Sequence, residues 1–416
     1  MERFFTDKRA PLRMRGCFLG GFLDLFAARL VEVGYARQTI RRQLQSVVRF
    51  AHWLQTRDIT VHEISLEHVK EYMEQRCQRS DKGVPFTLKR FVRLLAEQGV
   101  VQLKSRCESR NPAAELVESY AGYLSRERGL CPSTICNYTE YARSFLQSKF
   151  ANNELTFAML SCADVVRFVQ IQAATLGSKR AKLMTTALRS FCQYLRYQGY
   201  IDVDLKAAVP TVPNWRMADI PRALPAHQVE LVLSKCGRRT PTEQRDYAIL
   251  LLLARLGLRG GEIVSLKLDD IDWEAGLINV RGKGDQVSQL PIPPDVGEAI
   301  AFYLKNGRPT TSFRALFLRA RAPITGLENQ TAVGCLVKRA LARAGINSPR
   351  KGAHQFRHSL ATRMLKQGAT LEQIGELLRH QHPQTTEIYA KVDLDSLKRL
   401  ACRGQEVCNE QFKGRS

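Results

Sequence analysis

The residues best suited to chemistry lie in the C-terminal half of the chain, and one cluster of them opens the segment HQFRHSLATRMLKQG. His354, Arg357 and His358 occupy its first, fourth and fifth positions. Residues three apart lie on one face of a helix, so His354 and Arg357 would point at a common location. A guanidinium can bind two phosphate oxygens at once, and an imidazole can exchange a proton near neutral pH. The pattern predicts chemistry at a phosphate group.

Residues of matching chemistry occur before and after this segment. They are Arg259 and Glu262 in GLRGGEI, Lys283 in a GKGD turn, and His380 and Tyr389 in RHQHPQTTEIYAKV. Attack on a phosphodiester spreads negative charge over its non-bridging oxygens, which two arginines can hold in a geometry that lysine cannot supply. A tyrosine can be the attacking group if a base and nearby positive charge activate its phenol.

Each of these residues also has an ordinary structural explanation. Arg-x-x-Glu on a helix is usually a surface ion pair, and a lysine in a glycine-rich hairpin is usually solvated. Tyr389 alone would be a core aromatic, and His380 alone would be a cation at a helix C-terminus. The order and spacing of the whole set favour an active site. We interpret the remaining His382 as structural.

In order and spacing, the set resembles the catalytic signature of the tyrosine site-specific recombinases, also called the phage-integrase family. That signature runs Arg-x-x-Glu/Asp, a hairpin Lys, His-x-x-Arg, then His or Trp, with the nucleophilic Tyr nine residues later, and every position is filled here. The resemblance covers residues 222–400 closely, although Gly260-Gly261 departs from the bulkier residues usual in the family. It implies an enzyme that cleaves and rejoins DNA through a covalent 3′-phosphotyrosine intermediate.

The resemblance assigns the phosphate and the nucleophile to four residues. Arg259 and Arg357 would hold the phosphate oxygens while Tyr389 attacks phosphorus. His354 is the candidate general base for the phenol.

The remaining roles concern the leaving group and the support of the site. His380 would donate a hydrogen bond to the scissile phosphate, and Lys283 would protonate the leaving 5′-oxygen. Glu262 would orient the cations of the site, and His358 is expected to have a supporting role. The sequence contains no cluster of carboxylates suited to a divalent ion, so we expect neither a metal nor another cofactor.

The elements that would hold these residues follow from periodicity and turn signals. EQRDYAILLLLARLG predicts a buried helix ending at Gly257, and LINVRGKGDQVSQLPIP predicts two strands around the GKGD turn. Helices follow in TAVGCLVKRALARAG, HQFRHSLATRMLKQG and TLEQIGELLRH, with Gly345 and Gly368 at helix C-caps. After Pro383, QTTEIYAKV begins another short helix.

The first half of the chain is predicted to be helical and internally duplicated. GYARQTIRRQLQSVVRFAHWL, from Gly34, has the same pattern as GLCPSTICNYTEYARSFLQSK, from Gly129, and two further pairs of blocks follow in the same order. Three matched blocks favour two tandem domains over a chance likeness between amphipathic helices. The prolines of VPTVPNWRMADIPRALP then predict an extended linker.

The predicted fold is mostly α-helical. Tandem SAM-like helical DNA-binding domains precede an α+β integrase-type catalytic domain with a small β-hairpin or sheet. The expected boundaries are residues 1–19 for an N-terminal tail, 20–107 for a first helical DNA-binding domain, 111–206 for a core-binding helical domain, 207–225 for a proline-rich linker, 226–400 for the catalytic domain and 401–416 for a C-terminal tail.

Charge and cysteine usage bear on partners and location. The net charge is +23, and residues 1–110 and 222–400 contribute excesses of nine and ten basic side chains. Positive charge spread over several domains favours an extended polyanion, double-stranded DNA, as the partner. Irregularly spaced cysteines, no long apolar run and no signal-peptide pattern predict a cytoplasmic protein, associated with the nucleoid when bound to DNA, and no membrane partner.

The resemblance also implies an assembly and a biological class. It implies a clamp around the duplex and a homotetramer, or related recombinase subunits, on two DNA sites. The duplicated helical arm favours integration or transposition of a mobile element. Two alternatives are a type IB topoisomerase-like enzyme and a non-catalytic DNA-binding regulator. The compact tandem helical domains argue against the first, and the filled catalytic set argues against the second.

Overall fold

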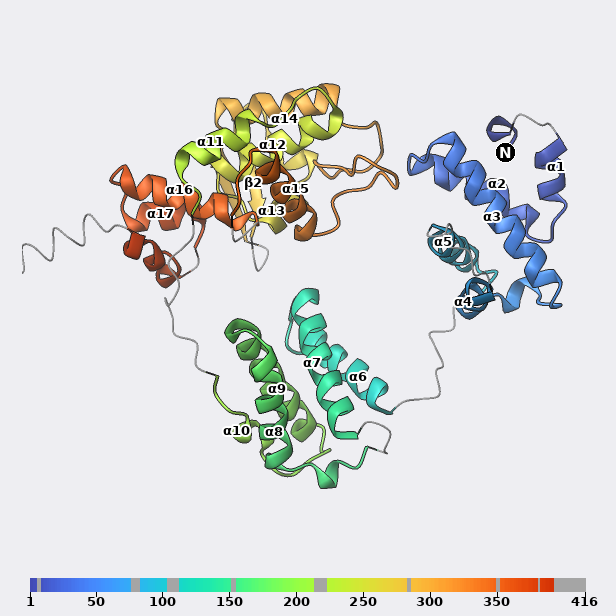
Figure 1. The fold of residues 1–416 in the computed structure, drawn as a ribbon, viewed down its shortest axis with the longest axis horizontal. Helices are drawn as coiled ribbons and strands as arrows, with labels where there is room; N and C mark the ends of the chain where they lie inside the picture. Colours follow the sequence, from blue (N-terminus) through green and yellow to red (C-terminus); the bar gives the residue numbers. More distant parts are fainter. Residues whose placement is uncertain are drawn as a thin grey trace, which may run out of the picture. The chain divides into compact units, whose positions relative to one another are not determined.

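The structure, a computed structural model, is mostly helical and contains one small sheet (Figure 1). The residues that it describes are 1–5, 9–75, 83–102, 112–150, 155–212, 223–282, 286–348, 352–380 and 382–392. Lys283 and the predicted tail 401–416 therefore lie outside the described residues. The chain divides into two compact units, one comprising residues 1–103 and 219–416 and the other residues 104–218. Among the described helices, none is long and apolar enough to cross a membrane.

Residues 1–103 contain a helical domain with a hydrophobic core of its own. Its elements are η1 (Glu2–Phe4), α1 (Arg9–Arg15), α2 (Gly20–Glu32), α3 (Arg37–Gln55), η2 (Val61–Glu63), α4 (Leu66–Gln75) and α5 (Val84–Glu97). Along α3 the buried residues Ile40, Leu44 and Val47 recur at helical spacing, so one face of the helix packs into the core and the opposite face is exposed.

The first residues of the chain belong to this domain. Phe4, Phe5 and Met14 are buried in the same cluster as the helices that follow. The prediction of an N-terminal tail over residues 1–19 was therefore wrong. The apolar residues of that segment are too irregularly spaced to give a helical period, so only their tertiary contacts reveal their burial.

Residues 104–218 contain the second helical domain. Its elements are α6 (Pro112–Arg126), α7 (Pro132–Phe150), η3 (Phe157–Met159), α8 (Cys162–Thr175), α9 (Ser178–Tyr197) and α10 (Leu205–Ala208). As in the first domain, a 19-residue helix is followed by a 3-10 turn and two further helices. Gly99 and Gly199 follow the last of these helices with φ of 70° and 73°, a left-handed conformation that glycine adopts without strain.

The predicted linker over residues 207–225 is too long at both ends. Val209 is buried in the core of the second helical domain, and Leu224 is buried in the core of the segment that follows. The proline pattern marks where the chain cannot form a regular helix, but it gives no information on which flanking side chains pack into a core.

The C-terminal segment combines helices with the sheet. Its elements are α11 (Ala226–Ser234), α12 (Pro241–Arg255), α13 (Gly260–Ser265), η4 (Leu268–Asp270), β1 (Ile271–Asp272), β2 (Leu277–Arg281), β3 (Val287–Pro291), α14 (Pro294–Asn306), α15 (Gln330–Arg343), α16 (His354–Lys366), α17 (Leu371–Leu378), η5 (Pro383–Thr385) and η6 (Glu387–Val392). The strands are antiparallel in the order β1-β2-β3, which confirms the predicted hairpin and adds a short third strand.

Helix α12 lies at the centre of the main core of this segment. A capping box between Thr240 and Glu243 begins the helix, and its residues from Ala248 to Ala254 are all buried. The helix ends at Arg255, and Gly257 follows with a φ of 60°, as the sequence predicts. Because α12 is surrounded by apolar neighbours, its C-terminal end is a fixed point from which the next residues leave the core.

A smaller core lies beside the main one. Leu360 and Ala361 of α16, Ile374 and Leu378 of α17, and Tyr389 form it. The segment QTTEIYAKV, predicted as one short helix, forms the two 3-10 turns η5 and η6 instead. Gly345 and Gly368 end α15 and α16 with positive φ, which confirms the predicted C-caps.

Candidate active site

The first candidate residue, Arg259, is held where the chain leaves α12. Gly257 has a positive φ, and a Cβ there would lie only 2.8 Å from Leu378 and 3.0 Å from Leu360, so this turn requires glycine for two reasons. Leu258 is fully buried, and Arg259 then serves as the N-cap of α13. The guanidinium remains about one third exposed and is therefore available to a ligand.

Glu262 holds Arg259 in this position. The backbone N–H of Arg259 donates to Glu262 Oε2 at 2.8 Å, and the Arg259 Nη1 donates to Glu262 Oε1 at 2.6 Å. Burial alone would raise the pKa of the Glu262 carboxyl, but the Arg259 N–H and the positive charges of Arg379 and Arg259 outweigh it and lower the pKa. The carboxylate is therefore ionised at neutral pH, as its predicted supporting role requires.

Arg379 is a third guanidinium at this site, and sequence analysis did not single it out. Its Nη2 donates to Glu262 Oε2 at 2.8 Å, and its side chain is only 9% exposed. The residue ends α17 in the left-handed conformation, and its φ of 55° is unfavourable for any residue other than glycine. Its only signal in the sequence is its position directly before His380.

Arg357 is the most buried of the candidate cations. It is 4% exposed, its Nη1 donates to the carbonyl of Gly257 at 2.7 Å, and its Nη2 donates to the carbonyl of Leu378. Burial, followed by the positive charges of Arg259 and Arg379, lowers the pKa of Arg357. Two carbonyls from the ends of α12 and α17 thus fix the plane of this guanidinium.

Tyr389 is packed against α16, and its hydroxyl contacts a histidine. The residue is 2% exposed, and the distance between Tyr389 Oη and His358 Nδ1 is 2.9 Å. Burial raises the pKa of the phenol, while the positive charges of Arg357 and Arg259 act in the opposite direction. The imidazole that contacts the phenol is therefore His358, to which sequence analysis assigned a supporting role.

His380 also lies close to the phenol ring. Its ring is nearly parallel to that of Tyr389, at 4°, with the ring centroids 6.5 Å apart. Burial, and then the charges of the neighbouring arginines, lower the pKa of His380 to about 4, so the imidazole is neutral at pH 7.

A buried hydroxyl group fixes the orientation of this imidazole. The distance between His380 Nδ1 and Thr386 Oγ1 is 2.7 Å, and Thr386 is 3% exposed. If the hydroxyl donates this hydrogen bond, Nε2 carries the proton of the neutral ring, and Nε2 can then donate to a phosphate oxygen. Thr386 is a second residue of the site that sequence analysis missed.

His354 begins α16 on the exposed side of the site. Partial burial of the ring, followed by the charges of Arg357 and Arg259, lowers the pKa of His354. The structure thus brings together all the sequence-predicted residues that it describes. Lys283, the eighth, lies outside the described residues, although the flanking hairpin closes through the Gly282 N–H, which donates to Gln286 O at 2.8 Å.

Comparison with known proteins shows which family the chain belongs to. Residues 222–395 match the model of the phage integrase family. The chain is 47% identical, over 90% of its length and 92% of the relative's, to the putative integrase/recombinase y4rA of Sinorhizobium fredii. The chain belongs to the phage integrase family of tyrosine recombinases. This tyrosine recombinase is accordingly an enzyme that breaks and rejoins DNA strands.

Other tyrosine recombinases are similar over shorter stretches. The chain is 34% identical to tyrosine recombinase XerA of Thermococcus onnurineus, over 68% of the chain and 93% of the relative. Among solved structures, a XerH site-specific recombinase bound to a palindromic difH substrate matches with a TM-score of 0.56. That match has 18% identity and covers 81% of this chain and 94% of the other, so it concerns the fold.

Proposed function

We propose that this tyrosine recombinase cleaves DNA with Tyr389 as its nucleophile, through a covalent 3′-phosphotyrosine. The observation that carries the proposal is the surroundings of one phenol. Tyr389 Oη lies 2.9 Å from His358 Nδ1, the His380 ring lies parallel to the phenol ring, and the charges of Arg357 and Arg259 act on it. These groups match what in-line attack on a phosphodiester requires.

The chemical step balances without an external energy source. The Tyr389 oxygen forms a bond to phosphorus as the bond from phosphorus to the 5′-oxygen breaks. The phenol proton passes to an imidazole, and the leaving 5′-oxygen takes a proton for which Lys283 is the predicted donor. Attack of a 5′-hydroxyl on the phosphotyrosine reverses the step and rejoins a strand, because the ester retains the energy of the original bond.

The charge of the site fits the transition state of this step. Arg259, Arg357 and Arg379 contribute three positive charges and Glu262 one negative charge, while the pKa of about 4 leaves His380 neutral. The sum is about +2, against about −1 for a phosphodiester and −2 for its pentacoordinate transition state. The protein thus binds the transition state more strongly than the substrate.

We propose that His358 is the first acceptor of the phenol proton. Its Nδ1 contacts the phenol, whereas His354 lies at the exposed start of α16. His358→Asn is then expected to slow single-turnover cleavage at pH 7 and to recover at high pH, where the phenol ionises without a base. If the cleavage rate of His354→Asn, rather than that of His358→Asn, recovered at high pH, the general base would be His354.

The proposed partner is double-stranded DNA. The net charge of +23 supports it, and the structures of XerH and of the Tn1549 transposon integrase, which has a TM-score of 0.51 and 19% identity, are described as bound to their DNA. We propose further that four protomers act on two DNA sites and that the protein works in the cytoplasm, on the nucleoid. Mass measurement of the complex with DNA tests the stoichiometry.

Integration or transposition of a mobile element is the proposed biological role. The helical repeat in the first half of the chain favours it, and it accords with a relative named as a putative integrase/recombinase. The test is a nicked suicide duplex built from the DNA that flanks the gene. Wild type is expected to form a covalent adduct, and Tyr389→Phe is expected to bind the duplex without forming one.

The two alternatives predict different results in the same assay. A non-catalytic regulator would bind the duplex, and wild type would form no adduct. A type IB topoisomerase-like enzyme would form adducts without site preference, relax supercoiled DNA and give no junction product between two sites.

A further inference from the structure

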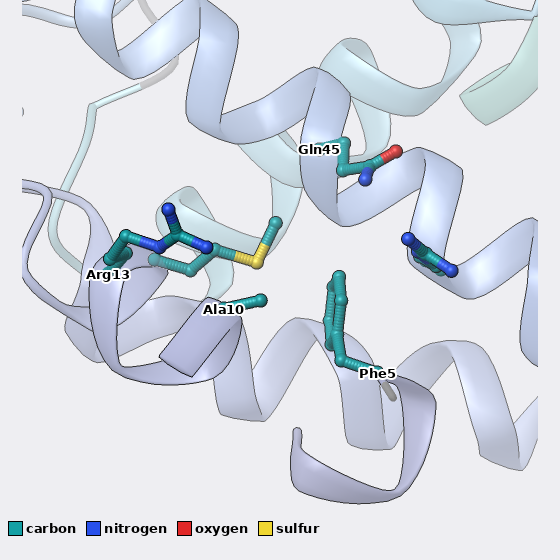
Figure 2. A pocket seen from close by; sticks show the side chains of 6 residues that line it. Phe5, Ala10, Arg13 and Gln45 are labelled. Atoms are coloured by element: carbon teal, nitrogen blue, oxygen red, sulfur yellow. The ribbon is translucent and has the colours of Figure 1, made fainter. Parts of the chain in front are cut away.

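The helices of this chain are packed with unequal tightness. In the first helical domain a hollow remains between α1 and α3, and Figure 2 shows Phe5, Ala10, Arg13 and Gln45 around it. In the catalytic segment, α17 lies so close to the residues between η5 and η6 that a glycine stands at the contact. Packing this close leaves no space for an added methyl group, so a change in one side chain displaces its neighbours.

Gly375 of α17 is the residue at this contact. A Cβ at its position would lie 3.1 Å from Thr386 Oγ1 and 4.0 Å from Thr386 Cβ, whereas ordinary van der Waals contact begins at about 3.4 Å. A side chain at Gly375 would therefore push the Thr386 hydroxyl away by a few tenths of an ångström. Thr386 is 3% exposed, so the displacement would pass to the groups that Thr386 contacts.

The backbone of α17 does not itself require glycine at this position. Gly375 lies inside the helix, without the positive φ of the glycines that end helices, and alanine is more favourable than glycine in a helix interior. Gly334 of α15 provides an internal comparison. It also lies inside a helix, but among the described residues a Cβ there would meet no atom of another element within 4 Å. The contact with Thr386 therefore distinguishes Gly375.

Thr386 connects His380 and Tyr389 to α17. Its hydroxyl lies 2.7 Å from His380 Nδ1, and its carbonyl accepts a hydrogen bond from the Tyr389 N–H at 2.9 Å. The His380 N–H in turn donates to the Gly375 carbonyl at 2.9 Å. A shift of Thr386 would thus disturb both the imidazole and the turn that carries the nucleophile.

We propose that Gly375 is a positioning residue of the active site, which acts by leaving space for the Thr386 hydroxyl beside His380. The hydroxyl donates to Nδ1, so the proton of the neutral imidazole is held on Nε2, from which it can be donated to a phosphate oxygen. The inference rests on the proposed function, and it adds a residue that acts only through Thr386.

Gly375→Ala in the full-length chain tests the inference by adding a single methyl group. Because a misplacement of about 1 Å can cost about 100-fold in rate, a shift of a few tenths of an ångström should slow adduct formation on the suicide duplex roughly tenfold. In a Thr386→Ala background the hydroxyl is absent, so Gly375→Ala should change the rate by less than about twofold. The matched control, Gly334→Ala, makes the same change inside a helix without the contact and should leave the rate unchanged.

Nuclear magnetic resonance of the full-length chain with ¹⁵N-labelled histidine gives a readout that a purely structural role would not move. The His380 signals, identified by their loss in His380→Gln, should show the proton on Nε2 in the wild type and a mixture of both tautomers in Gly375→Ala. Gly334→Ala should keep the wild-type signals. No DNA is present in this measurement, so a failure of the proposed function, seen as absence of a wild-type adduct, is distinguished from a failure of the inference.

The inference would be overturned by a proton on His380 Nδ1 in the wild type, by wild-type signals and cleavage in Gly375→Ala, or by an equal loss of cleavage in Gly334→Ala. A full additional loss in the Thr386→Ala background would overturn it as well. Thermal unfolding shows whether each variant is folded. If Gly375→Ala is unfolded at the assay temperature, adding Thr386→Ala relieves the contact and should restore folding; a double variant that stays unfolded would contradict the proposal.

Discussion

Replacement of Arg379 by glycine tests how the cations of the active site are organised. Glu262 is 5% exposed and accepts hydrogen bonds from both Arg259 and Arg379, so the variant leaves a buried carboxylate with one guanidinium in place of two. Removing one partner of a buried ion pair costs about 3–5 kcal/mol. Glycine at a φ of 55° recovers about 1–2 kcal/mol, because the left-handed conformation no longer strains a side chain. We expect a net destabilisation of roughly 1–4 kcal/mol.

The effect on cleavage is expected to be separate from the effect on folding. Without Arg379 the site loses one positive charge, and Glu262 can turn away from Arg259. A lost hydrogen bond to a charged group is worth about 1.5–3 kcal/mol, which corresponds to a decrease of roughly 10- to 100-fold in single-turnover cleavage. DNA affinity should change little, because only 9% of the Arg379 side chain is exposed.

The assay is adduct formation on a suicide duplex at temperatures where the variants remain folded, as measured by circular dichroism. Arg379→Lys restores the charge without the fork and is expected to recover part of the rate. In a Glu262→Gln background the carboxylate that Arg379 holds is gone, so Arg379→Gly should cost much less. If Arg379→Gly cleaved at the wild-type rate, this reasoning would be refuted. It would also be refuted if the effects of Arg379→Gly and Glu262→Gln on the cleavage rate were fully additive in the double variant.

Three further predictions concern the same site. Thr386→Val should lower the cleavage rate roughly tenfold because the tautomer of His380 is no longer fixed, whereas Thr386→Ser should retain the rate in the same assay. Because the pKa of Glu262 is lower in the folded protein than in the unfolded chain, where it is about 4.3, the ionised carboxylate stabilises the fold above that pH, and this stabilisation is lost as the pH falls. The melting temperature of Glu262→Gln should therefore depend less on pH between about 5 and 3 than that of the wild type. Arg357→Lys should lower the cleavage rate about 100-fold, because lysine cannot bond both carbonyls and a phosphate. Thermal unfolding and DNA affinity should show that the variant is folded. Near-normal cleavage would remove Arg357 from the site.

Much of the catalytic segment could be predicted from local signals. The glycines around Lys283 predict the hairpin, and Gly257 and Gly368 predict the ends of α12 and α16, because each of these features depends on a few adjacent residues. The spacing of His354 and Arg357 likewise predicts that both begin one helix. Such features need no knowledge of distant parts of the chain.

Long-range contacts account for what could not be predicted. Arg379 and Glu262 are 117 residues apart in the chain, and nothing around either residue indicates the pair. Tyr389 contacts His358, 31 residues earlier, and a sequence cannot distinguish that histidine from His354 four positions before it. The burial of Phe4 is missed for the same reason, since it depends on helices far along the chain.

The central claim is that Tyr389 forms the covalent bond to the DNA strand, and the position of that bond tests the claim most directly. Trypsin cleaves after arginine and lysine, so it is expected to cut after Arg379 and after Lys391 and to release residues 380–391 as one peptide. Mass spectrometry of the digested adduct should find a 3′-linked nucleotide on the phenol of Tyr389 in that peptide. A nucleotide on another residue, or cleaved DNA with no protein attached, would contradict the account.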